Sequence, residues 1–103
     1  MLFRRPFADA ISRQLDLFAE DSADMLAACE AAARDYDRAP RDEAEEAYGD
    51  YMDQVEWAAE ELAALRDAYA QTLDEDAAEK YIDAFDRAAA KRFPRLGAAV
   101  RRS

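Results

Sequence analysis

The chain has 103 residues and a formal net charge of −10, a length that supports one small domain rather than two separate cores. It has no histidine, which removes the commonest general base and most transition-metal sites. A single cysteine, Cys29, excludes an internal disulfide, and two glycines are too few for a glycine-rich phosphate-binding loop.

The composition predicts an all-α fold. Alanine, arginine, leucine and glutamate are abundant and favour helix, whereas β-branched residues are few. An acidic, lysine-poor, alanine-rich composition resembles that of cytosolic proteins from extreme halophiles, and it equally suits a GC-rich genome. No apolar run approaches the ~20 residues of a membrane span, and the N-terminal residues lack the pattern of a secretory signal. We therefore expect a cytoplasmic location.

The first predicted helix covers residues 7–38 and ends before Pro40, because the residue before a proline is pushed out of helical geometry. Apolar residues recur mostly at spacings of three and four, as on one face of a helix. This seam comprises Phe7, Ile11, Leu15, Phe18, Ser22, Met25, Cys29, Ala32 and Tyr36. Asp21 and Ser22 favour helix starts, so a break there is an alternative to one continuous helix. We interpret Cys29 as a small buried hydrophobic residue rather than a reactive thiol.

Residues 41–72 form the second predicted helix and have the clearest periodicity. Their seam repeats as a heptad pattern over more than three heptads, as in a coiled coil. It comprises Ala44, Tyr48, Tyr51, Val55, Ala58, Leu62, Leu65 and Tyr69. A third helix is predicted over 75–93, started by Thr72 with Glu75 as a capping box or by Asp74 as N-cap. Its apolar positions are Ala78, Tyr81, Ile82, Phe85, Ala89 and Phe93.

These three seams predict an antiparallel up-down-up three-helix bundle with two long helices and a shorter third. The bundle domain spans residues 1–93. Pro94 and Gly97 mark its end, and residues 94–103 are expected to form a short basic C-terminal tail.

Charge is strongly polarised along the chain, since residues 41–79 carry 14 acidic residues against two arginines and the C-terminal part is basic. One interpretation is that these charges pair within the molecule. It places Lys91, Arg92 and Arg95 near the acidic start of the second helix, at Asp42, Glu43, Glu45 and Glu46, and Arg4 and Arg5 near Asp74, Glu75 and Asp76. The other interpretation is that the basic and apolar residues from Lys91 onward dock on an acidic protein or membrane surface.

Carboxylates are the remaining candidates for a chemical site. Glu46, Asp50, Asp53, Glu56 and Glu60 follow one another at three- and four-residue spacings along the second helix. Because this row lies outside the apolar seam, we interpret it as a solvated face. The alternative is a weak Mg²⁺ or Ca²⁺ site, since these cations prefer oxygen ligands.

Trp57 and Met52 lie outside the seam of the second helix, which is therefore aromatic or apolar on more than one side. The conservative interpretation is that this helix contacts two neighbouring helices. The alternative is an exposed aromatic patch, which would mark a protein interface.

The leading hypothesis is a non-enzymatic helical protein that forms a homodimer or docks on a larger protein. The expected partner-binding residues are Tyr48, Tyr51, Met52, Trp57, Lys91, Arg92, Phe93 and Arg95. We expect no cofactor, no resident metal and no small-molecule substrate. We do not expect nucleic acid as a partner, because the acidic middle of the chain would repel phosphates. A carboxylate-based metal-binding bundle and an acidic inhibitor of a basic surface are the competing hypotheses.

Overall fold

The structure, a computed structural model, describes residues 7–103 and contains no β-strand in that range. The all-α prediction is therefore correct. The predictions for Arg4 and Arg5 fall outside the described residues. Residues 7–103 form five helices in chain order: α1 (Ala8–Asp21), α2 (Ala23–Arg38), α3 (Ala44–Ala70), α4 (Glu75–Arg92) and α5 (Gly97–Arg102).

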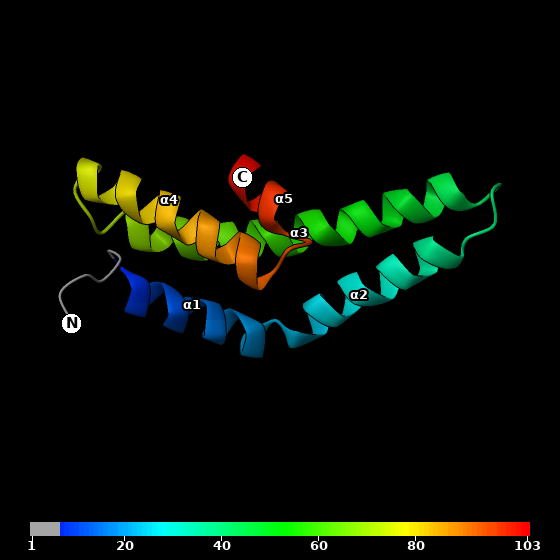
Figure 1. Ribbon diagram of the computed structural model, residues 1–103, viewed down its shortest axis with the longest axis horizontal. Helices are drawn as coiled ribbons and strands as arrows, with labels where there is room; N and C mark the ends of the chain where they lie inside the picture. The colour runs from blue at the N-terminus through cyan, green and yellow to red at the C-terminus, as the bar shows by residue number, and fades with distance from the viewer. Residues whose placement is uncertain (1–6) are drawn as a thin grey trace.

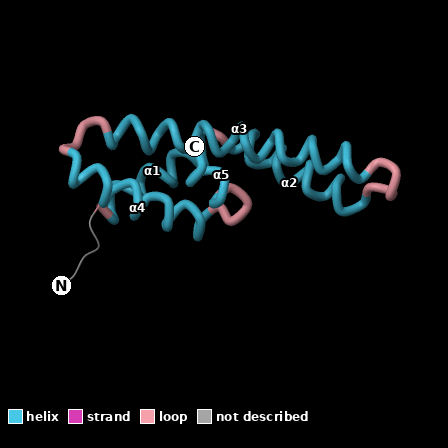
Figure 2. The backbone as a smooth tube through the Cα atoms, turned by 90° about the horizontal axis from the view of Figure 1, so that it is seen from above, coloured by secondary structure: helices cyan, strands magenta, loops and turns pink. Residues whose placement is uncertain are grey.

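The molecule is elongated, with principal dimensions of 54 × 25 × 22 Å. Helix α2 packs along the first half of α3, and these two segments form an arm that extends away from the other helices (Figures 1 and 2). Helices α4 and α5 pack against α3, and α1 lies along α4. The second half of α3 is thus the element around which the wider end of the molecule is built.

The predicted three-helix topology is not what the structure shows. The first predicted helix is divided at Ser22 into α1 and α2, at the position where the alternative interpretation placed a break. The Ser22 side chain makes no capping hydrogen bond, so its preference for helix starts is not the direct cause of the break. The bend lets α1 accompany α4 while α2 follows α3, and one straight helix could not do both.

The N-cap of helix α4 is Asp74, one of the two helix starts that the sequence predicts. The Asp74 carboxylate accepts a hydrogen bond from the backbone N–H of Ala77 at 2.9 Å. The Thr72 hydroxyl instead donates to the carbonyl of Tyr69 at 2.7 Å, within the end of α3. Asp74 is therefore the residue that starts the helix, and Glu75 and Asp76 add favourable charge to its first turn.

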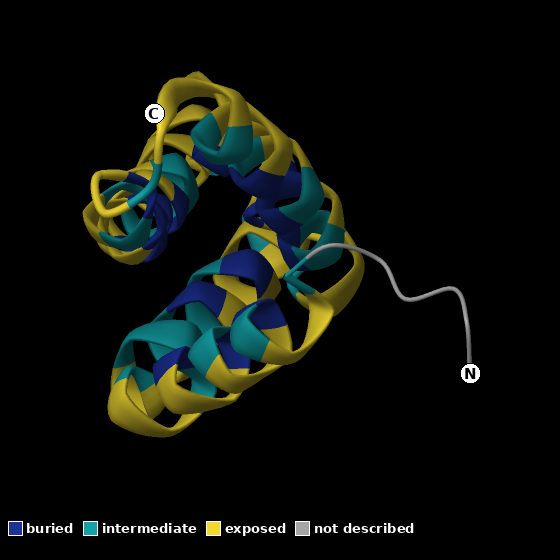
Figure 3. Ribbon diagram, turned by 90° about the vertical axis from the view of Figure 1, so that its left-hand side faces the viewer, coloured by how far each residue is buried: buried dark blue, intermediate teal, exposed yellow. Residues whose placement is uncertain are grey.

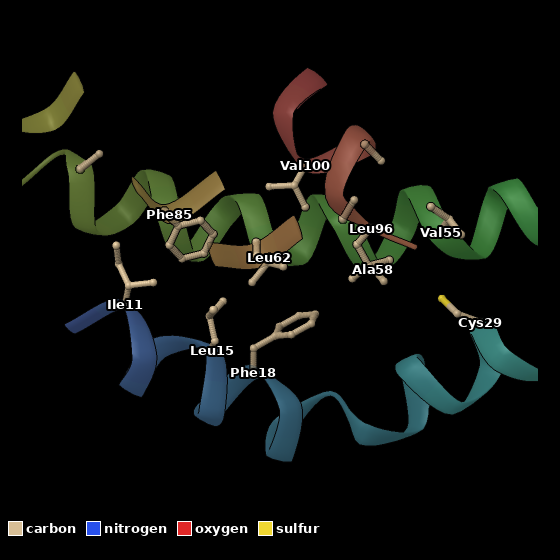
Figure 4. Packing of buried hydrophobic residues seen from close by; sticks show 14 of the residues in the cluster. Ile11, Leu15, Phe18, Cys29, Val55, Ala58, Leu62, Phe85, Leu96 and Val100 are labelled. Carbon is tan, nitrogen blue, oxygen red and sulfur yellow. The ribbon is translucent and has the colours of Figure 1, made fainter. Parts of the chain in front are cut away.

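The core lies where α1, α4 and α5 meet the second half of α3. Buried positions of the helices face inward around this region (Figure 3). Ile11, Leu15 and Phe18 of α1 point toward the same space as Leu62 and Phe85 (Figure 4). Cys29 is also buried, as predicted, and its side chain points toward α3 in the arm. Several core positions of α3 are alanines, and they bury little apolar area each.

The buried face of α3 departs from the predicted heptad seam toward its C-terminal end. Leu65 is exposed, although the seam includes it. The seam residue Tyr48 is also exposed, but it lies near the start of α3. Ala63 and Arg66 are buried in the segment where the seam predicted Leu65. The reason is that α5 packs on α3 here and draws the buried face around the helix toward itself.

The segment expected to be a basic tail contains helix α5 and is packed against the rest of the chain. Leu96, Ala99 and Val100 are buried, and Leu96 and Val100 point toward α3 (Figure 4). Gly97 lies against α4 so closely that an added Cβ would be 2.9 Å from the Cβ of Ala90 and 3.1 Å from its Cα. A glycine is therefore required where α5 crosses α4.

We expect opposite effects from placing alanine at the two glycines. Gly97→Ala should destabilise the protein by about 1–3 kcal/mol, because backbone atoms of α4 would have to move. Gly49→Ala should stabilise it by about 0.5–1 kcal/mol, since Gly49 is inside α3 and no neighbouring atom of residues 7–103 lies within 4 Å of the added Cβ. Urea denaturation measures both, and equal effects at the two sites would contradict the close packing of α5.

Candidate functional site

The structure separates the eight predicted partner-binding residues into three places rather than one surface. Tyr48 and Tyr51 lie in the arm, where both contact Tyr36 and Tyr51 also contacts Arg95. Trp57 lies on another face of α3, and Lys91 and Arg92 line a groove between α1 and α4. The other two, Met52 and Phe93, are half-buried. Phe93 packs edge-on against Phe18, with ring centroids 5.5 Å apart, and is part of the fold rather than a free contact residue.

Trp57 is exposed on the side of α3 that faces away from the core. Its exposed fraction is 54%, whereas Ala58 and Ala59 beside it are fully buried. A residue two positions beyond Val55 points about 200° away from it around a helix, so Trp57 is opposite the buried seam. The conservative interpretation, that this helix contacts two neighbouring helices, is confirmed, because α3 packs against both α2 and α4. That packing does not account for Trp57, which lies opposite the buried face and is more than half exposed.

Carboxylates surround Trp57. Residues that are three, four or seven positions apart lie on the same side of a helix. We call this set the outer face of α3: Asp50, Asp53, Trp57, Glu60 and Glu61. All five are exposed. The surface thus combines one large aromatic side chain with four acidic ones.

The arm holds an aromatic cluster formed by Tyr36, Tyr48 and Tyr51. Tyr36 stacks on Tyr51 with ring centroids 6.5 Å apart, and it contacts Tyr48 at 5.3 Å. Arg95 donates hydrogen bonds to the Tyr51 hydroxyl at 3.2 Å and to Glu30 at 2.9 Å. The bond to Glu30, followed by that to Tyr51, raises the pKa of Arg95 above its ordinary value. Tyr51 and Arg95 therefore have partners inside the chain and join the arm to the turn before α5.

Comparisons with protein-family models, curated proteins and solved structures find no match for this chain. Its function must therefore be argued from its own surfaces.

The predicted pairing of the C-terminal cations with the start of the second helix is wrong. Arg92 pairs with Asp16 of α1 at 2.8 Å, and Arg95 pairs with Glu30 of α2. The start of α3 lies at the far end of the arm, where α2 is its neighbour (Figure 1), and so it is out of reach of these residues.

A groove of about 830 Å³ runs between α1 and α4. Its apolar lining comes from Ile11, Leu15, Ala84 and Ala88. The charged residues that line it are Lys80, Asp83, Arg87, Lys91 and Arg92. Four cations against one carboxylate make this groove basic in a protein of charge −10. We call it the α1–α4 groove.

The α1–α4 groove is the feature that our sequence analysis missed. The signal that could have found it is the position of the lysines, because Lys80 and Lys91 are the only two in the chain and both line the groove. They are 11 residues apart, or about three turns, so they point the same way from α4. Arg87 lies between them and pairs with Asp83 on the same helix.

The carboxylate row of α3 is a solvated surface, as expected: Glu46, Asp50, Asp53, Glu56 and Glu60 are all exposed. Residues 7–103 contain no group of three or more metal-ligating side chains placed to hold an ion. No helix within that range is both long and apolar enough to cross a membrane.

Cys29 is held as a thiol by its surroundings. Its Sγ lies 3.4 Å from the carbonyl oxygen of Gln54, to which it donates. Burial, with a further contribution from Glu30, raises the pKa of the Cys29 thiol. A buried thiol with a raised pKa is a poor nucleophile, so Cys29 has the properties of a packing residue.

Proposed function

We propose that the protein is a non-catalytic interaction protein that binds a protein partner through the outer face of α3, centred on Trp57. The observation that carries the proposal is the exposure of Trp57, because the fold leaves more than half of this large side chain accessible to water. Tryptophan is enriched among the residues that dominate binding energy at protein interfaces. The partner surface must offer an apolar site for the ring and cations for the surrounding carboxylates.

Two features support a role without catalysis. The chain has no histidine, and the raised pKa of its single thiol disfavours a reactive thiolate. The core is small and alanine-rich, so binding of a partner would add stability by mass action.

Trp57→Ala should reduce partner binding by about ten-fold or more while leaving stability nearly unchanged, because the ring contacts water in the free protein. Leu17→Ala is the matched control, since Leu17 is similarly exposed (52%) but lies on α1. The tagged full-length protein and both variants are compared by quantitative affinity capture from extract of the source cells, together with their thermal unfolding. If no captured protein, including untagged copies of the chain itself, depends on Trp57, the proposal is wrong.

A further inference from the structure

The two lysines of the α1–α4 groove are free to contact another molecule. Within residues 7–103, no carboxylate lies within 4.0 Å of either ammonium group, whereas Arg87 and Arg92 each have an acidic partner. Lys80 and Lys91 are separated by about 16.5 Å along α4 and differ in direction by about 20°. The groove therefore presents two free cations at a fixed spacing, with Ala84 and Ala88 between them.

The outer face of α3 has the same spacing with the opposite charge. Asp50 and Glu61 are also 11 residues apart on one helix, and Trp57 lies between them on the same side. If α3 runs antiparallel to α4 with Asp50 opposite Lys91, then Glu61 is opposite Lys80. The same register places Trp57 opposite Ala84, where the small side chain leaves room for the indole ring.

We propose that the partner is a second copy of this chain, whose outer face of α3 docks in the α1–α4 groove in this antiparallel register. The inference rests on the proposed function, because it names the partner of the face that Trp57 occupies. Two charged pairs fix the register, and the indole ring covers the apolar lining of the groove. The occupant is a second copy because the chain itself carries a face that matches the groove in charge, in spacing and in apolar content.

The mode of assembly follows from the use of two different surfaces. A contact between unlike surfaces is heterologous and makes a closed ring or an open chain, according to the rotation between copies. The net charge of −10 on each copy opposes association. At 0.15 M salt this repulsion is screened beyond about 8 Å, whereas the Lys–carboxylate pairs act at shorter range.

Sedimentation of the purified full-length chain tests the proposal. We expect a mass that exceeds 11.6 kDa and rises with concentration, and a shift of the fluorescence of Trp57, the only tryptophan, to shorter wavelength as it enters the groove. Lys80→Glu with Lys91→Glu should weaken association by about ten-fold or more, as should Asp50→Lys with Glu61→Lys. Mixing these two double variants should restore association. The acidic groove of the lysine variant can then bind the basic outer face of the other variant, and the acidic outer face of the lysine variant can bind the basic groove of the other.

The matched control is Arg34→Glu with Arg101→Glu, which changes the net charge as much as the lysine double variant does, at exposed positions outside both surfaces. This control should associate as the unmodified protein does. Circular dichroism establishes that each variant is folded. A mixture of folded double variants that stays monomeric, or an unmodified chain that stays monomeric at hundreds of micromolar, would overturn the proposal. If Trp57-dependent capture of a different protein persists in that case, the proposed function stands and only the identity of the partner is wrong.

Discussion

Replacing Arg66 with methionine should destabilise the protein by about 3–5 kcal/mol, the range for breaking a buried ion pair. Arg66 is only 4% exposed, and its Nη1 donates to the Asp86 carboxylate and to the Val100 carbonyl, both at 3.0 Å. Its Nη2 donates to the carbonyl of Ser103 at 3.0 Å. One guanidinium thus joins α3 to α4 and to the end of α5. Small domains are stable by only about 5–15 kcal/mol, so this loss is a large fraction of the total.

Two further variants separate the effect of the buried Arg66–Asp86 pair from that of the more exposed hydrogen bond between Arg66 and Asp67. Asp67→Asn should cost less than about 1 kcal/mol, because the carboxylate that accepts from Arg66 Nε at 2.8 Å is half-exposed. Arg66→Met combined with Asp86→Leu should be more stable than Arg66→Met alone, since no unpaired carboxylate remains buried. Urea denaturation of the four proteins gives these differences. A cost below 1 kcal/mol for Arg66→Met would show that the pair does not hold α5.

Loss of the Arg66 hydrogen bonds should destabilise α5 before the rest of the fold. This helix has six residues, and its last carbonyls depend on the guanidinium. Isolated helices of that length are not stable in water, so α5 depends on its contacts with α3 and α4. Hydrogen exchange of the amides of Val100 and Arg101 should therefore accelerate in Arg66→Met more than that of Leu62 in the core.

Most of the helical structure could be predicted from local signals. Pro40 predicted the end of α2 at Arg38, and Asp74 predicted the start of α4, because each residue acts through its own backbone geometry or hydrogen bond. The apolar spacing of α1 and α4 also predicted their buried apolar residues correctly, as at Ile11 and Phe85, but not the buried Asp86.

The parts that could not be predicted depend on contacts between distant segments. The many arginines of residues 94–103 suggested a solvated tail, although Leu96, Ala99 and Val100 have the spacing of a short apolar helix face. The partners of Arg66, Asp86 of α4 and the last carbonyls of α5, are distant in the sequence, so a charged residue in the core was not considered. Arg66 follows Leu62 at helical spacing, and that is the signal that could have found it.

The two candidate surfaces also differ in whether they could be predicted from the sequence. Trp57 could be singled out because it departs from the apolar seam, and this depends on α3 alone. The sequence did not say whether another helix covers Trp57, and in the structure this residue is more than half exposed. The α1–α4 groove was missed because its lining comes from two separate helices, so no pattern within one helix shows it.

Tyr81 should make the stability of the protein fall at alkaline pH. Its ring is fully buried among Phe7, Tyr69 and Phe85. Burial, the main cause, raises the pKa of Tyr81 to about 12. The unfolded chain releases this proton near pH 10, whereas the folded chain holds it to higher pH. The stabilisation is therefore complete below pH 10 and is lost as the pH rises to about 12, and two pKa units correspond to about 3 kcal/mol.

Tyr81→Phe isolates this effect, because phenylalanine cannot ionise. At neutral pH the variant should be about 1 kcal/mol less stable, since the Tyr81 hydroxyl donates to Gln14 Oε1 at 2.7 Å. Between pH 9 and 12 it should lose about 2 kcal/mol less than the unmodified protein, so the order of stability reverses. Tyr48→Phe, at an exposed tyrosine, is the control and should keep the full alkaline loss. Parallel curves for Tyr81→Phe and the unmodified protein would mean that water reaches the Tyr81 hydroxyl in the folded state.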